Sequence, residues 1–340
     1  MKIVIATDAW RPQVNGVVHT LERMTKAATE LGAAFEFVTP QGFATLPLPT
    51  YPDIRVALAT SQEVGAQIER SGADHVHIAT EGPIGWAARS YCLSRGRLFT
   101  TSYHTRFPEY ISARALVPEA WTYAALRSFH APAACVMAPT PSICRELTQR
   151  GFARVKVWSR GVDHALYRPQ SGDALALPKP IFLYVGRVAV EKNLEALLSL
   201  DLPGSTVIVG DGPARSSLRQ RFPRAHFLGS RFGEALARIY ASADVFVFPS
   251  RTDTFGIVLI EALASGLPVA AFPVTGPIDV IGDSGAGVLS EDLRAACLAA
   301  LEIPRQKARA HSLNFTWEES ARQFLGHIEA CWAERRAAAG

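Results

Sequence analysis

Short apolar runs alternate with a helical pattern along the first part of the chain. Four of these runs predict strands, at residues 2–7, 35–39, 75–78 and 98–102. Between the first two, Val18, Leu21, Met24 and Ala28 recur every three or four residues, and Gly32 then offers a helix stop. This order of elements predicts a parallel sheet with helices on both faces.

The same alternation starts again after Pro180. Predicted strands cover residues 181–185, 206–209, 227–228 and 245–248, and predicted helices cover 193–200 and begin again near 256. Residues 164–179 have turn-forming residues and no period, so we predict an interdomain linker there. A last helix is predicted over 317–336, with Phe324, Ile328 and Trp332 on one stripe.

This pattern predicts an α/β protein with two Rossmann-like, doubly wound parallel-sheet domains. In such folds ligands bind beyond the carboxyl ends of the strands. We therefore expect the two domains to face each other across a cleft that holds the ligand.

Composition and missing motifs narrow the function. Of 340 residues, 48% are hydrophobic and 19% charged, which is typical of a globular protein. No membrane span or signal-peptide core is evident, and the five scattered cysteines predict reduced thiols in a cytoplasmic protein. The chain has no Gly-x-Gly-x-x-Gly, Walker, zinc or Asp-x-Asp motif, which disfavours dinucleotide, ATP-driven and metal-dependent chemistry.

Positive charge is concentrated in one segment. The net charge is only +4, yet residues 84–160 hold eleven Lys and Arg against three Glu, together with several aromatic residues. Such a segment indicates an anionic membrane surface or a polyanionic partner, or else a solvated basic face.

The strongest candidate for ligand chemistry lies at residues 250–266. A predicted helix begins near Gly256, and backbone amides at a helix start suit a diphosphate. Asp253 and Glu261 bracket this start, and carboxylates beside a phosphate site suit the hydroxyls of a sugar or ribose. Alternatively, Asp253 caps the helix and Glu261 is solvated.

Four further candidate residues follow predicted strands. Arg187 and Lys192 come after strand 181–185, where two cations could neutralise a leaving diphosphate, or form a weak surface ion pair with Glu191. Gly16, in the first strand-to-helix loop, would let the backbone approach a ligand or form a tight turn. His104 would contact substrate at a strand end or be a structural histidine.

Together these motifs resemble the GT-B glycosyltransferases of family 4, and in particular the lipid-directed mannosyl-, glucosyl- and sulfoquinovosyltransferases. The matching segments are 7–17, 103–105, 159–163, 185–193, 209–213 and 250–269. The family's two glutamates, separated by seven residues, correspond here to Asp253 and Glu261. The first acid is thus one methylene shorter, which bears on how the donor sugar is recognised.

The resemblance implies a division of labour between the domains. Residues 1–165 would bind the acceptor, residues 166–316 would bind the nucleotide sugar, and a C-terminal helix, 317–340, would pack back on the first domain. Catalytic roles fall to His104 near the transferred sugar, Arg187 and Lys192 on the diphosphate, and Asp253 facing the donor sugar. The implied donor-binding residues are Gly16, Gly229 near the base, Phe255, Gly256, Ile257, Val258, and Glu261 on the ribose.

The implied activity is that of a retaining, metal-independent hexosyltransferase without a cofactor. Its donor would be a UDP- or GDP-sugar, and its acceptor a membrane glycolipid precursor such as diacylglycerol. The protein would be cytoplasmic and peripheral at the inner face of the membrane. The side chains expected at the anionic bilayer are those of Arg106, Arg114, Trp121, Tyr123, Arg127 and Phe129.

Other functions remain open at this stage. The acceptor could be soluble or a polysaccharide, and the same fold serves sugar-nucleotide epimerases and phosphorylases. A non-catalytic sugar-nucleotide-binding protein would result if Asp253 disables the chemistry. Nucleic acid is not expected as a partner, because only the basic charge suggests it.

Overall fold

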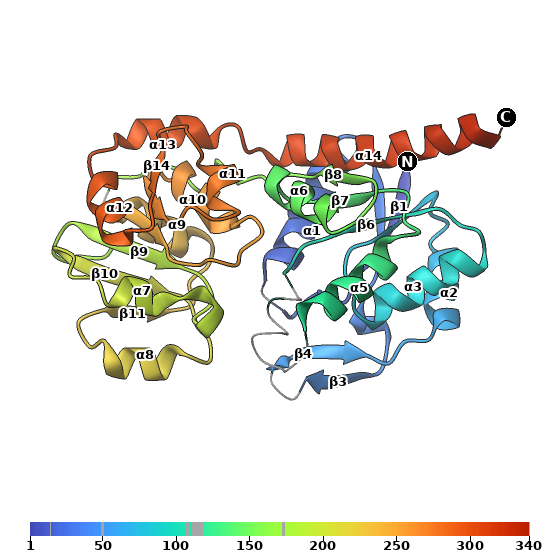
Figure 1. Ribbon diagram of the computed structural model, residues 1–340, viewed down its shortest axis with the longest axis horizontal. Coiled ribbons are helices and arrows are strands. Elements are labelled where there is room, and N and C mark those ends of the chain that lie inside the picture. The colour runs from blue at the N-terminus through green and yellow to red at the C-terminus, as the bar shows by residue number, and fades with distance from the viewer. Residues whose placement is uncertain (14, 49–50, 107–108, 110–117, 172–173, 340) are drawn as a thin grey trace. The chain divides into compact units, whose positions relative to one another are not determined.

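A computed structural model describes residues 1–13, 15–48, 51–106, 109, 118–171 and 174–339 and divides the chain into two compact units (Figure 1). Unit 1 comprises Met1–Arg160 and Trp317–Gly340, and unit 2 comprises Gly161–Thr316. The boundary that the sequence placed at residues 165 and 166 thus lies just inside unit 2.

Unit 1 is built on a six-stranded parallel sheet in the order β2-β1-β5-β6-β7-β8. Its strands are β1 (Lys2–Ala6), β2 (Ala34–Val38), β5 (His75–Ile78), β6 (Phe99–Ser102), β7 (Val136–Ala138) and β8 (Val155–Val157). Its helices are α1 (Gly16–Glu30), α2 (Ser61–Arg70), α3 (Pro83–Ser94), α5 (Glu119–His130), α6 (Pro141–Gln149) and α14 (Trp317–Ala339). A short helix, η1 (Pro40–Gly42), and an antiparallel hairpin, β3 (Thr45–Leu48) with β4 (Tyr51–Ala57), complete this unit.

Successive residues of β1 face two different cores. Ile3 and Ile5 pack with α1 and α14, whereas Val4 and Ala6 pack with α2 and α3. Side chains alternate across a strand, so this buried strand needs a helical cover on both sides. Part of one cover is α14, which carries the fully buried Phe324 and Ile328.

Unit 2 repeats this architecture with a six-stranded parallel sheet in the order β11-β10-β9-β12-β13-β14. Its strands are β9 (Ile181–Val185), β10 (Ser205–Val209), β11 (His226–Gly229), β12 (Val245–Phe248), β13 (Val269–Ala271) and β14 (Gly287–Leu289). Its helices are η2 (Val190–Lys192), α7 (Leu194–Leu198), α8 (Arg215–Arg221), α9 (Gly233–Ser242), α10 (Ile257–Ala264), α11 (Pro277–Val280), α12 (Leu293–Ala300) and α13 (Arg305–Ser312). The predicted doubly wound parallel-sheet class is confirmed for both units.

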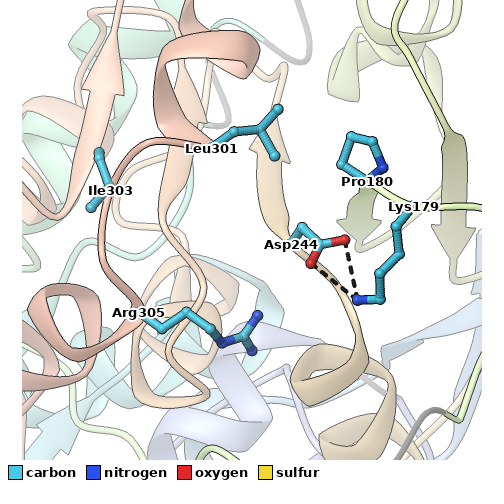
Figure 2. A pocket seen from close by; sticks show the side chains of 6 residues that line it. All are labelled: Lys179, Pro180, Asp244, Leu301, Ile303 and Arg305. Carbon is cyan, nitrogen blue, oxygen red and sulfur yellow. Dashed lines mark hydrogen bonds and ion pairs between the residues drawn. The ribbon is translucent and has the colours of Figure 1, made fainter.

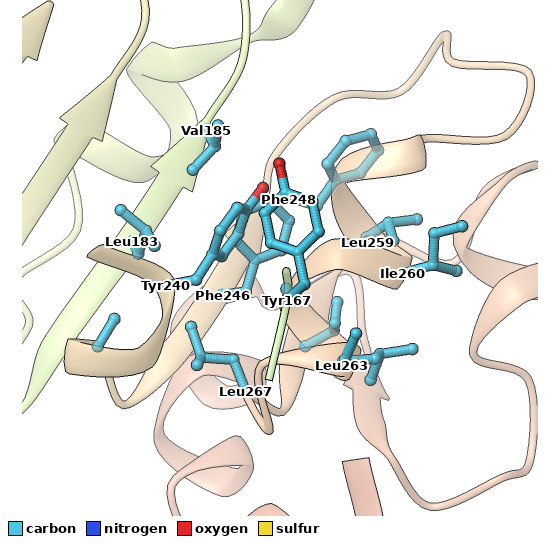
Figure 3. Packing of buried hydrophobic residues seen from close by; sticks show 14 of the residues in the cluster. Tyr167, Leu183, Val185, Tyr240, Phe246, Phe248, Leu259, Ile260, Leu263 and Leu267 are labelled. Carbon is cyan, nitrogen blue, oxygen red and sulfur yellow. The ribbon is translucent and has the colours of Figure 1, made fainter. Parts of the chain in front are cut away.

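The predicted linker at 164–179 is wrong in its described part, because this segment packs on unit 2. Figure 3 shows Tyr167 beside Tyr240 in the hydrophobic core, and their ring centroids are 5.7 Å apart. The backbone is held too, since Arg309 donates to the Tyr167 carbonyl at 2.9 Å. A large buried aromatic residue anchors the segment despite its turn-forming composition.

Phe324 offers a test of the packing of α14. Its replacement in Phe324→Ala should destabilise unit 1 by about 3–5 kcal/mol, because a buried aromatic side chain leaves a cavity. Urea unfolding followed by tryptophan fluorescence measures the loss, with Glu329→Ala on the exposed side of the same helix as control. Equal stability of the two variants would show that α14 contributes little to the core.

Candidate functional site

The sheet of unit 2 reverses its strand order at one place. From β9, the chain adds β10 and β11 on one side and then crosses over to add β12, β13 and β14 on the other. Ligands of doubly wound sheets bind beyond the carboxyl ends of the strands at such a switch point. Here that position lies between the loops that follow β9 and β12, at residues 186–193 and 249–256.

Three side-chain interactions join these two loops. The Nζ atom of Lys192 lies 2.5 Å from Oδ1 of Asp253. Asn193 Nδ2 donates to the Pro249 carbonyl at 3.0 Å, and Thr252 Oγ1 donates to the Glu191 carbonyl at 3.4 Å. The structure therefore brings Lys192 and Asp253, which are distant in sequence, into direct contact.

The ion pair is not a solvated surface contact. Only 18% of the Lys192 side chain and 17% of the Asp253 side chain are exposed. Asp253 does not occupy the cap position of α10 either, because Gly256 is the N-cap residue. The capping alternative for Asp253 is thus contradicted, since its Oδ1 atom contacts Lys192 instead.

Two buried oxygen atoms in the loop after β12 have no hydrogen-bond partner among the described residues. They are Oδ2 of Asp253 and Oγ of Ser250. A buried polar atom without a partner is costly, so it needs an explanation such as a ligand. A hydroxyl donor would satisfy the carboxylate oxygen.

The start of α10 depends on the backbone of Gly256. Its φ angle is +84°, and a Cβ atom there would lie 3.0 Å from Leu259 and 3.2 Å from Phe248. The neighbouring Phe255 side chain is buried and packs edge-on against Phe315. Phe255 can therefore offer only backbone, while Ile257 and Val258 form the first turn of α10, where amide groups point outward.

Glu261 lies in the second turn of α10 and is 7% exposed, so the solvated alternative is wrong. Its Oε2 atom accepts a hydrogen bond from the Tyr240 hydroxyl at 3.0 Å. Burial and the Glu261 charge raise the pKa of Tyr240 well above its usual range, so this hydroxyl stays protonated and donating. Tyr240 has an anchoring role that the sequence analysis missed, because α9 shows only an apolar stripe there.

The loop after β9 is fixed by the loop after β10. The Tyr184 hydroxyl donates to the Arg187 carbonyl at 2.9 Å, and Val188 N donates to the Asp211 carbonyl at 2.9 Å. At Gly210 a Cβ atom would lie 1.9 Å from the Gly186 carbonyl oxygen, so only glycine permits this approach. The Arg187 side chain is exposed on this rigid backbone.

Gly229 lies at the same edge of the unit 2 sheet, where the carboxyl ends of the strands meet. It ends β11, and its carbonyl accepts from Gly210 N at 2.9 Å. The predicted site residues of unit 2 therefore lie at one edge of one sheet, after β9, at the end of β11 and after β12. Their roles remain predictions.

Gly16 and His104 belong to unit 1. Gly16 is the exposed first residue of α1, and Asn15 Oδ1 caps this helix by accepting from Val17 N and Val18 N at 3.0 Å. His104 follows β6, and its Nδ1 atom lies 3.2 Å from Nη2 of Arg160. Burial and the charges of Arg160 and His77 hold the pKa of His104 well below its usual range, so the ring is neutral.

The predicted membrane-facing set is only partly at the surface. Tyr123 and Phe129 are buried in the core of unit 1, and Arg106 binds Glu146 at 2.6 Å, so these three assignments are corrected. Trp121 is 72% exposed, and Arg127 is exposed on the same helix, α5. Arg114 lies outside the described residues.

A hollow of about 420 Å³ opens at the other edge of the unit 2 sheet (Figure 2). It is lined by Lys179, Pro180, Asp244, Leu301, Ile303 and Arg305. Lys179 and Asp244 precede β9 and β12, and their side chains form an ion pair at 3.1 Å. It thus lies at the amino ends of the strands, away from the candidate site.

No cluster of three or more His, Cys, Asp or Glu side chains suited to a metal ion occurs within the described ranges.

Comparisons with known proteins decide the family. The model described as Glycosyltransferase Family 4 matches residues 14–166, and that described as Glycosyl transferases group 1 matches residues 179–303. A GDP-mannose-dependent alpha-mannosyltransferase of Mycobacterium tuberculosis is 30% identical, with 98% of both chains covered. The chain belongs to the family 4 glycosyltransferases.

This glycosyltransferase is also 32% identical to the sulfoquinovosyl transferase SQD2 of Arabidopsis thaliana, over 72% of this chain and 52% of that protein. Sucrose-phosphate synthase from Thermosynechococcus elongatus superposes with a TM-score of 0.81 at 21% identity, covering 98% of this chain and 99% of that one. The predicted GT-B fold and the predicted reaction class, sugar transfer from a nucleotide sugar, are thereby confirmed.

Gly256 provides the test of the site's backbone. Gly256→Ala forces a side chain into the left-handed region, which costs about 1–3 kcal/mol, and pushes it against Leu259 and Phe248. We expect weaker binding of the nucleotide-sugar donor by calorimetry, because the start of α10 must move. Gly233→Ala is the matched control, since its φ is also positive (+54°) but no atom lies within 4 Å of the added Cβ. Unchanged donor affinity in Gly256→Ala would contradict the assignment.

Proposed function

We propose that this glycosyltransferase is a retaining, metal-independent hexosyltransferase. It takes a hexosyl group from a GDP- or UDP-sugar, without a cofactor, and transfers it to a hydroxyl group of a membrane glycolipid precursor. It works from the cytoplasmic side of the membrane as a peripheral protein.

The bridge between Lys192 and Asp253 carries the donor assignment. It holds the ammonium group of Lys192, on the loop that also presents Arg187, against the carboxylate of Asp253 at the switch point. The two cations neutralise the donor diphosphate as it leaves, and preorganised charge of this kind stabilises a transition state strongly. The unsatisfied Oδ2 atom of Asp253 accepts from a hydroxyl of the donor sugar.

Transfer proceeds by attack on the face that the diphosphate leaves. The bond from the anomeric carbon to the phosphate oxygen breaks as the acceptor oxygen bonds to that carbon. The acceptor proton passes to the departing phosphate oxygen, and Arg187 and Lys192 stabilise the remaining negative charge. His104 donates from its neutral ring to a hydroxyl of the transferred sugar.

The name of one relative supports retention of the anomeric configuration and suggests which donor to assay first. The Mycobacterium tuberculosis relative is named a GDP-mannose-dependent alpha-mannosyltransferase. GDP-mannose carries its sugar in the α configuration, so an α-linked product means that configuration is retained. GDP-mannose is therefore the first donor to assay, followed by UDP-sugars.

The surface of α5 supports a lipid acceptor. Trp121 and Arg127 are both exposed on this helix, and amphipathic rings and basic groups favour an anionic membrane interface. In the described part of the chain, no helix has the length and apolar character needed to span a bilayer. We propose that its contact with the membrane is peripheral.

Arg187→Ala tests the donor chemistry. We expect turnover to fall by about 10²–10³-fold, because one stabilising group for the developing charge is lost. Arg219→Ala, which removes another exposed arginine of unit 2 on α8, should keep both turnover and melting temperature. Near-normal sugar transfer by a folded Arg187→Ala protein would remove the main catalytic assignment.

Trp121→Ser tests the acceptor class. The protein should sediment with vesicles rich in anionic lipid at low salt, and the variant should do so less, because it loses its interfacial ring. Neutral vesicles and the solvent-exposed substitution Glu329→Ala serve as controls. Absence of binding by the unaltered protein would favour a soluble or polysaccharide acceptor instead.

A further inference from the structure

Arg160 is a buried cation without an acidic partner in the described part of the chain. Only 4% of it is exposed, and its guanidinium lies 4.4 Å from the centre of the Trp158 ring. Its Nη1 atom donates to the carbonyls of Trp158 at 2.5 Å and Ser159 at 3.2 Å. Burial lowers the pKa of Arg160 to about 9, which leaves it protonated at neutral pH.

Burying a charged group is costly unless an opposite charge or hydrogen-bond partners compensate for the lost hydration. Carbonyl oxygens satisfy Nη1, but Nη2 is directed to the ring of His104, 3.2 Å from Nδ1. A guanidinium can only donate hydrogen bonds. The Nδ1 atom of His104 must therefore accept, and the single proton of the neutral ring must sit on Nε2.

The turn that presents Arg160 is anchored by the C-terminal helix. Trp158 Nε1 donates to the Ser320 carbonyl at 3.2 Å, and the Ser320 hydroxyl donates to the Ser159 carbonyl at 2.8 Å. Gln323 Oε1 accepts from Ser159 N at 2.9 Å. The ring of Trp158 also packs edge-on against His104, with centroids 5.6 Å apart.

We propose that Arg160 is a positioning residue that fixes His104 as a neutral ring with its proton on Nε2. The helix α14 contributes by holding the turn at 158–160. This inference rests on the proposed function in one respect: His104 is useful as an Nε2 donor only if it meets the substrate. The tautomer itself is a property of unit 1 and can be measured without any substrate.

Nitrogen NMR of protein labelled in the histidine rings tests the proposal. A long-range proton–nitrogen spectrum at neutral pH distinguishes a protonated ring nitrogen from an unprotonated one, and His104→Ala identifies the signals. We expect Nε2 protonated and Nδ1 unprotonated in the unaltered protein. Wild-type His104 protonated on Nδ1, or on both nitrogens, would overturn the proposal without any further variant.

Arg160→Met removes the donor at similar side-chain length. We expect the pure Nε2–H pattern to be lost, with a signal from protonated Nδ1, and at least partial recovery in Arg160→Lys, which restores a donor. The matched control is Arg89→Met: Arg89 also donates to two carbonyls, those of Phe129 and Ser128, and stacks on Trp86 at 5.1 Å. If Arg160→Met leaves the His104 pattern unchanged, the proposal is wrong.

Sugar-transfer kinetics on the same variants separate this inference from the proposed function. Loss of the Nε2–H pattern together with a lower kcat supports both. Loss of the pattern with unchanged transfer supports the role of Arg160 on His104 and contradicts a donor role for His104 in the reaction. A lower kcat with an unchanged pattern contradicts the positioning role.

Discussion

The contact between Lys192 and Asp253 is the constraint on which the candidate site depends. It closes the loops after β9 and β12 against each other at the point where the strand order reverses. The sheet dictates that both loops emerge at its carboxyl edge, because all six strands are parallel. The ion pair then sets their separation, and Gly256 directs the start of α10 at the same place. Charge, sheet topology and one left-handed residue together define a surface suited to a sugar diphosphate.

Each member of this ion pair can also bind a group of the proposed substrate. In the described structure the ammonium group lies against a carboxylate, so the attraction between the two charges offsets part of the cost of burying them. In the proposed reaction, Lys192 binds the donor diphosphate, and the carboxylate of Asp253 accepts hydrogen bonds from hydroxyls of the donor sugar. Lys192 and Asp253 would each exchange the other for a group of the substrate, so neither would be left without a partner.

Much of the architecture could be predicted from the sequence, because buried parallel strands leave a strong apolar signal. Residues 181–185 and 245–248 were predicted within their observed bounds, and the motifs that follow them were found for that reason. The strands Val136–Ala138, Val269–Ala271 and Gly287–Leu289 were not, since three residues are too few to show a pattern. The prolines and glycine of segment 164–179 predict a linker, because no local pattern reveals that Tyr167 is buried. Partners such as Tyr240 for Glu261 and Arg160 for His104 could not be found, because tertiary contacts join residues that share no local pattern.

Hydrogen–deuterium exchange tests most directly whether the loops after β9 and β12 bind the nucleotide sugar. The protein is compared alone and with GDP-mannose, UDP-glucose, GDP and UDP. The account predicts that a nucleotide which raises the melting temperature also slows exchange in peptides covering residues 186–193 and 250–258. Protection confined to other regions, such as the hollow around Lys179 and Arg305, or no protection with any of these nucleotides, would contradict it.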